Sequence, residues 1–154
     1  MTIRRATPAD AAELVRLRSI MLRSFHRGDW NDDWCEPARA SLARRLAAAE
    51  PTLAAFVADR PDGSGLAASV IGIIEERLGG PGNPDGRAGY VFSVSTEPDM
   101  RRRGYSRACM EALLQWYRDQ GVRVVDLRAS PDGEPLYTSL GFTRTSDPAM
   151  RLRL

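Results

Sequence analysis

The chain has no lysine: all 22 of its basic residues are arginine, and 20 acidic residues leave a net charge of +2. GC-rich codon usage is our preferred explanation for this bias. Without lysine, the protein has no side-chain amine that forms a Schiff base or accepts an acetyl group. The small net charge gives no general reason to expect a nucleic-acid partner.

Histidine and cysteine are scarce as well. The one histidine is His26, and the two cysteines, Cys35 and Cys109, form no CxxC pair. A structural zinc site needs about four Cys or His ligands, so we expect no metal. No G-x-S-x-G segment surrounds a serine, which argues against a serine hydrolase.

Long apolar runs are also missing. No stretch approaches the 18 or more apolar residues of a membrane span, and residues 1–5 lack the apolar core of a signal peptide. We therefore expect a cytoplasmic protein without a membrane partner. A length of 154 residues, 43% hydrophobic and 27% charged, suits a single domain over residues 1–154.

The hydrophobic periodicity predicts a mixed α/β fold. Strands are expected at residues 2–6, 53–58, 66–78, 88–96 and 122–129, and helices from residue 7 through 21 and at 37–49, 104–120 and 134–140. A last pair of strands is expected at 142–145 and 150–154. The order includes one β-α-β unit between Tyr90 and Ala129.

The turn before the helix at 104–120 favours phosphate binding. It consists of Arg101-Arg102-Arg103-Gly104-Tyr105-Ser106. The first N–H groups of a helix have no intrahelical acceptor, and the helix dipole adds partial positive charge there. Gly104 lets the backbone approach a ligand closely, and arginine binds phosphate bidentately. The order strand, turn, helix therefore predicts a pyrophosphate site rather than a merely solvated helix start.

Two segments resemble the signature motifs of one enzyme family. Arg101-x-x-Gly104-x-Ser106 resembles the [QR]-x-x-G-x-[GA] loop of the GNAT superfamily of N-acetyltransferases, with Ser106 in place of the usual Gly or Ala. Pro135 to Phe142 resembles the family's L-Y-x-x-x-G-F segment. Over nearly the whole chain, this resemblance implies a mixed, largely antiparallel sheet of six to seven strands. Helices on both faces and a central β-α-β unit that binds CoA would complete the fold.

The same resemblance implies acetyl-CoA as the acyl-donor cosubstrate. Backbone amides of the arginine turn would hold the CoA pyrophosphate, and the pantetheine arm would lie where two strands separate. A backbone N–H near Val94 or Ser95 would polarise the thioester carbonyl. The residues expected to contact CoA are Val94, Ser95, Thr96, Arg101, Arg102, Arg103, Gly104, Tyr105, Ser106 and Arg107.

Tyr137 is the candidate general acid, and its partner base is left open. It would protonate the departing thiolate, although its alternative role is an aromatic anchor beside Phe142. An alkyl amine with a pKa of about 10.4 is mostly protonated at pH 7, so a base or a water chain is expected. The sequence does not choose among Glu75, Glu76, Glu97, Asp126 and His26.

The acceptor site is expected on the loop that joins the first two helices. Trp30, Asp32 and Asp33 would stack on and attract a cationic amine. The equal alternative is a solvated loop that its tryptophans anchor to the core.

The resemblance thus implies an N-acetyltransferase in which a primary amine of a small molecule or peptide attacks the thioester of acetyl-CoA directly. The alternative is a non-catalytic acyl-CoA-binding module of the same fold. A nucleic-acid- or partner-binding role for the arginine cluster is a third reading, and it predicts steep salt dependence. The resemblance also allows a homodimer.

Overall fold

The computed structural model describes all residues, 1–154. The strands are β1 (Ile3–Arg5), β2 (Leu53–Asp59), β3 (Leu66–Glu76), β4 (Arg87–Thr96) and β5 (Val125–Leu127). The helices are α1 (Ala11–Arg23), α2 (Cys35–Leu46), α3 (Tyr105–Asp119) and α4 (Glu134–Ser139), with short 3-10 helices at Pro8–Asp10 and Pro98–Met100. None of these helices is both long and apolar enough to cross a membrane.

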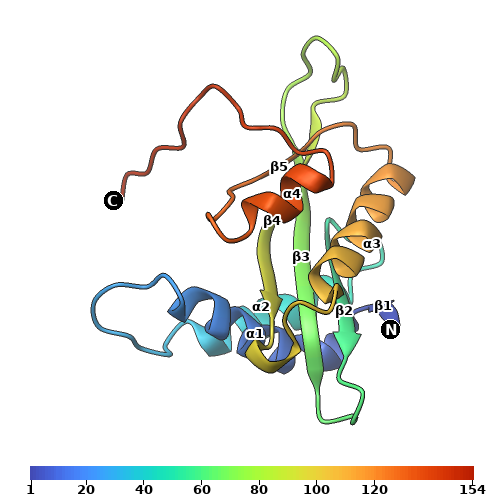
Figure 1. The fold of residues 1–154 in the computed structure, drawn as a ribbon. Coiled ribbons are helices and arrows are strands. Elements are labelled where there is room, and N and C mark those ends of the chain that lie inside the picture. The colour runs from blue at the N-terminus through green and yellow to red at the C-terminus, as the bar shows by residue number, and fades with distance from the viewer.

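The strands form one five-stranded sheet in the order β1-β2-β3-β4-β5 (Figure 1). The first four strands pair antiparallel, and β5 pairs parallel to β4 from Gly89–Val125 to Val91–Leu127. Because α3 connects these two parallel strands, the expected β-α-β unit is confirmed. The largely antiparallel mixed sheet is confirmed with it.

Helices cover both faces of the sheet, as expected. On one face α1 and α2 bury an apolar cluster that includes Leu14, Leu17 and Leu42. On the other face α3 buries Cys109, Leu113 and Trp116, the stripe that its helical spacing predicts. Tyr137 of α4 belongs to this second cluster. The sheet is therefore a central layer between two separate apolar cores.

Tyr117 of α3 packs directly onto the backbone of the two central strands. Its hydroxyl lies 3.0 Å from the carbonyl oxygen of Ile73 and 3.2 Å from that of Tyr90, to which it donates. A Cβ at Gly72 would lie 2.2 Å from this hydroxyl, and one at Gly89 would lie 2.7 Å from the ring. Glycine at both positions is what allows α3 to approach the sheet this closely.

The expected strands at 142–145 and 150–154 are not formed, so the sheet has five strands rather than six or seven. Alternation of Met150, Leu152 and Leu154 with arginines suggested a strand, but these three side chains are exposed. A strand needs a paired edge and a covered apolar face, and the tail has neither. Figure 1 shows it extending away from the sheet. The strand expected at 122–129 is shorter as well, since only Val125–Leu127 pairs with β4.

Candidate active site

The arginine turn between β4 and α3 presents a row of free backbone donors. Arg102 and Gly104 both adopt left-handed backbone conformations, with φ of 60° and 82°. The backbone N–H groups from Arg101 through Arg107 donate to no acceptor within the protein. Left-handed residues in a turn make concave N–H nests that bind anions. The predicted phosphate loop thus has a backbone shaped for an anion.

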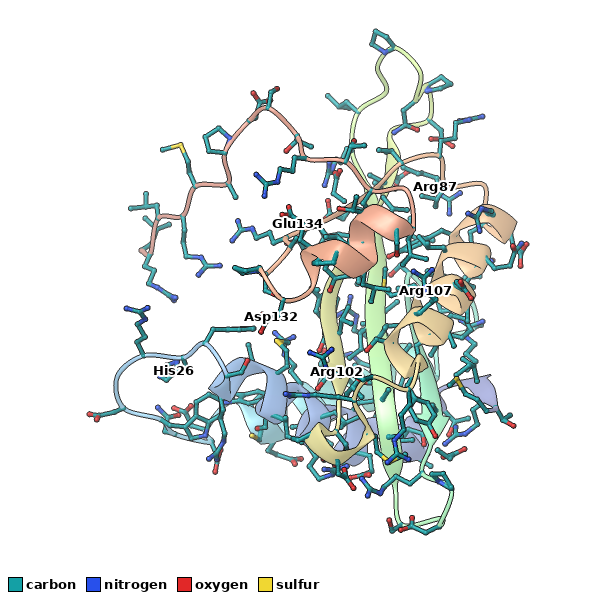
Figure 2. All side chains as sticks on the ribbon, viewed as in Figure 1. His26, Arg87, Arg102, Arg107, Asp132 and Glu134 are labelled. Carbon is teal, nitrogen blue, oxygen red and sulfur yellow. The ribbon has the colours of Figure 1, made fainter.

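The side chains of this turn differ in whether they are free to bind a ligand. Arg103 donates to the Asp99 carbonyl oxygen at 3.2 Å, and Arg107 donates to Ser139 Oγ on α4. Arg102 has no partner and is exposed beside the start of α3 (Figure 2). The Tyr105 side chain is buried in the core, so only its backbone faces the turn.

Ser106 replaces the usual Gly or Ala without disturbing the helix start. Its hydroxyl hydrogen-bonds to Thr96 Oγ1 at the end of β4. This contact ties the first turn of α3 to the strand that precedes it.

Beyond Val91, β4 and β5 no longer pair, so the separation expected between these strands is present. Val94 and Thr96 remain paired with β3 on the other side of β4. Ser95 turns its side chain away, because its Oγ donates to the Leu17 carbonyl oxygen at 2.7 Å. Where the separation begins, Ile71 pairs with Ser93 and Gly72 with Val91, which leaves Phe92 as the extra residue of a β-bulge.

A cavity of about 460 Å³ opens at this separation. Its walls come from α1, β4, the end of β5, α4 and the C-terminal tail, and they are formed by Arg18, Met21, Leu22, Phe25, Tyr90, Val91, Phe92, Val94, Leu127, Arg128, Ser130, Tyr137 and Arg151. The Tyr137 ring is almost buried and lies edge-on to Phe142, with 6.1 Å between centroids. Burial raises the pKa of its hydroxyl, which has no hydrogen-bond partner in the protein. Tyr137 therefore presents a protonated donor to the cavity.

Residues 16–142, which make up most of the chain, match the acetyltransferase (GNAT) family. The chain belongs to this family. The aminoglycoside N(6')-acetyltransferase type 1 of Stenotrophomonas maltophilia is 33% identical over 125 residues, which cover 79% of this GNAT chain and 71% of the relative.

Two solved structures share the fold of this GNAT protein. A predicted acetyltransferase from Clostridium acetobutylicum, crystallised with acetyl-CoA, superposes with a TM-score of 0.85 at 23% identity, covering 99% of this chain and 95% of that chain. A GCN5-related N-acetyltransferase from Ralstonia eutropha JMP134 gives 0.84 at 24% identity, covering 98% and 97%. The family and fold inferred from the two sequence motifs are both confirmed.

None of the five candidate bases lines the cavity of the GNAT protein. Glu97 is paired with Arg16, and Glu75 with Arg77. His26, on the loop after α1 (Figure 2), donates from Nε2 to the Asp29 carbonyl oxygen at 2.9 Å. Asp126 lies 3.6 Å from Arg77, and Glu76 is exposed at the end of β3.

In the loop between α1 and α2 of the GNAT protein, Trp30 and Asp32 already have partners within the protein. Trp30 Nε1 donates to Asp32 at 2.8 Å, and Arg23 lies 3.7 Å from the same carboxylate. The Arg23 guanidinium also covers the Trp30 ring, 4.7 Å from its centroid. Asp33 is exposed, and none of Trp30, Asp32 and Asp33 lines the cavity.

Sequence reasoning missed the three arginines of the cavity, Arg18, Arg128 and Arg151. A signal exists for Arg18 alone. It follows Leu14 by four residues and precedes Leu22 by four, so it interrupts the apolar stripe of α1 with a charge. Arg128 and Arg151 reach the cavity only through tertiary folding.

Proposed function

We propose that this protein is an N-acetyltransferase that moves an acetyl group from acetyl-CoA to a primary amine of a small molecule or peptide. The observation that carries the proposal is that β4 connects two features of this site. The strand is unpaired with β5 beyond Val91, where the cavity at Tyr137 lies, and it leads into the turn whose N–H groups at residues 101–107 are free.

The CoA pyrophosphate would bind the free N–H groups of the arginine turn, with Arg102 as the most available guanidinium. Backbone–phosphate contacts at a helix start need no particular side chain. The pantetheine arm would then run along β4 at Val94 and Thr96, on the side that β5 leaves unpaired. Ser95 would contribute its backbone alone, because its hydroxyl is engaged with Leu17.

The thioester carbonyl would lie at the bulge. The extra residue of a bulge drops out of the strand ladder, so the Phe92 N–H is a donor for the oxygen that becomes negative during attack. This places the donor just upstream of Val94 and Ser95. Tyr137 would donate to the departing sulfur. A thiol has a pKa of about 8.5, so the thiolate leaves readily and this donation gives a modest gain.

The amine would reach the thioester without a dedicated base in the protein. No carboxylate or imidazole lines the cavity, so the ammonium proton would leave to solvent before or during binding. On this mechanism the rate rises with pH until the acceptor's own amine is deprotonated.

The test is an acetyl-CoA-dependent thiol-release assay across amino acids, polyamines, peptide N-termini and aminoglycosides, the last because of the relative's name. Titration calorimetry with acetyl-CoA is run beside it. Binding with turnover of one amine class supports the proposal. Binding without turnover of any amine would favour the non-catalytic CoA-binding alternative, and no binding would refute both. Light scattering of the same preparation tests whether the chain forms the homodimer that the family resemblance allows.

A further inference from the structure

All charged side chains around the cavity carry the same sign. They are Arg18, Arg128 and Arg151, and no Asp, Glu or His lines the walls. They converge from α1, from the residue after β5 and from the C-terminal tail. None of the three forms an ion pair with a carboxylate of the protein. Asp132, on the neighbouring loop in Figure 2, is exposed and stands outside the lining.

Arg18 is the clearest case, because it is partly buried as well as unpaired. Arg16 and Arg23 on the same helix each pair with a carboxylate. Arg18 instead lies over the Phe92 ring, 5.5 Å from its centroid, and makes one long hydrogen bond of 3.4 Å to the Phe92 carbonyl oxygen. Burial lowers the pKa of its guanidinium. A charge withdrawn from water is normally paired, so its missing partner points to a ligand.

We infer that the acceptor amine also carries an anionic group, a carboxylate or a phosphate, which Arg18, Arg128 and Arg151 bind. This inference rests on the proposed function and names its substrate class. The planar guanidinium binds either anion through two parallel hydrogen bonds. Arginines on three separate walls would surround the anion.

The other residues of the cavity wall indicate the polarity and size of the acceptor. Met21, Leu22 and Phe25 line the α1 side beside Arg18, so the body between amine and anion is apolar. The cavity of about 460 Å³ must also receive the acetyl end of CoA. The acceptor is therefore small, and an amino carboxylate of about the size of leucine fits these conditions.

The same arginines act on the reacting amine. Nearby positive charge disfavours an ammonium ion and lowers its pKa, which increases the neutral, nucleophilic fraction in a cavity without a base. A polycation such as an aminoglycoside would bring several ammonium groups into this field, and like charges repel. The acceptor of this protein therefore differs in charge from the one that the relative's name gives.

The experiment compares matched acceptors with the purified full chain. Leucine, leucinamide, 3-methylbutylamine, O-phosphoethanolamine and kanamycin are assayed at saturating acetyl-CoA. We expect kcat/KM for leucine or O-phosphoethanolamine to exceed that of the uncharged-tail amines and kanamycin by about tenfold or more. The favoured member of the pair identifies the anion. Arg18→Gln should raise the KM for that acceptor about tenfold, with much less change in the KM for acetyl-CoA. The rate with 3-methylbutylamine, which has no anion to lose, should fall less than that of the favoured acceptor.

Arg44→Gln on α2 is the matched control, because it removes the same charge from an exposed site outside the cavity. Turnover that prefers kanamycin or 3-methylbutylamine and ignores Arg18→Gln would overturn the inference while leaving the proposed function intact. If no amine is acetylated, the proposed function fails, and calorimetry of leucine and O-phosphoethanolamine against the CoA-saturated protein decides the inference. Binding that Arg18→Gln abolishes supports it, and absence of binding overturns it.

Discussion

The Arg18 guanidinium lies against Phe92, 5.5 Å from the ring centroid, and its Nη1 is 3.4 Å from the Phe92 carbonyl oxygen. Phe92 is also the extra residue of the bulge at which β4 separates from β5. Phe92 therefore belongs to both halves of the proposed reaction. Its N–H is proposed to polarise the thioester, and its carbonyl oxygen and ring contact Arg18, which is proposed to bind the acceptor.

Removing the Tyr137 hydroxyl tests the general-acid assignment. Tyr137→Phe should lower kcat by roughly 10- to 100-fold, since general-acid help is limited for a thiolate leaving group. The KM for acetyl-CoA and the melting temperature should hardly change, because the hydroxyl bonds to no protein group. Full activity in this variant would leave Tyr137 as an aromatic anchor beside Phe142.

Arg102 allows charge and backbone strain to be separated. Its φ of 60° is strained for a side-chain-bearing residue, at a cost of about 1 kcal/mol that glycine avoids. Arg102→Gly should therefore keep or slightly raise the free energy of unfolding, while it raises the KM for acetyl-CoA and weakens that constant's dependence on salt. Arg153→Gly, in the exposed tail, is the control. An unchanged KM would remove Arg102 from the CoA site.

The contact of Tyr117 with the sheet predicts a non-additive pair of mutations. Gly72→Ala places a methyl group 2.2 Å from the Tyr117 hydroxyl and should cost about 1–3 kcal/mol of unfolding free energy, as overpacking does. Tyr117→Phe alone should cost about 1 kcal/mol through its lost hydrogen bond. In the Tyr117→Phe background the cost of Gly72→Ala should shrink. Urea denaturation of the wild type, the two single variants and the double variant measures the four unfolding free energies. Gly80→Ala, whose added methyl group would meet no atom within 4 Å, is the control. Strict additivity would contradict the contact.

Protonation of Asp10 is expected to account for part of the loss of folding stability at low pH. Hydrogen bonds from Arg4, at 2.9 Å to both oxygens, hold the pKa of Asp10 below its ordinary value. Since the folded pKa is the lower one, this contribution is complete above the unfolded value of about 3.9 and is lost as pH falls through the folded value. Asp10→Asn should therefore lower the melting temperature at pH 6 and converge with wild type near pH 2. A difference independent of pH, or an equal effect of Asp147→Asn in the tail, would contradict the assignment.

The local elements were predictable because their signals are local. The apolar stripe of α3 and the order strand, turn, helix around Gly104 depend on residues close together in the chain. The free N–H groups of residues 101–107 follow from the same order, since every helix start leaves donors without acceptors. The paired strands at 142–145 and 150–154 were wrong because alternation indicates a strand only where another strand is available to pair with it.

By itself, the sequence determined the family, the mixed α/β fold and the position of the arginine turn between β4 and α3, because each depends on short motifs and on the order of elements. Only the tertiary structure decided where β4 leaves β5, that the bulge falls at Phe92, and which charges meet in the cavity. Arg18, Arg128 and Arg151 are far apart in the chain, and their joint positive charge arises from the packing of α1, β5 and the tail around one space. A site assembled from three distant segments has no local pattern in the sequence, so the proposal of an anionic acceptor could come only from the three-dimensional structure.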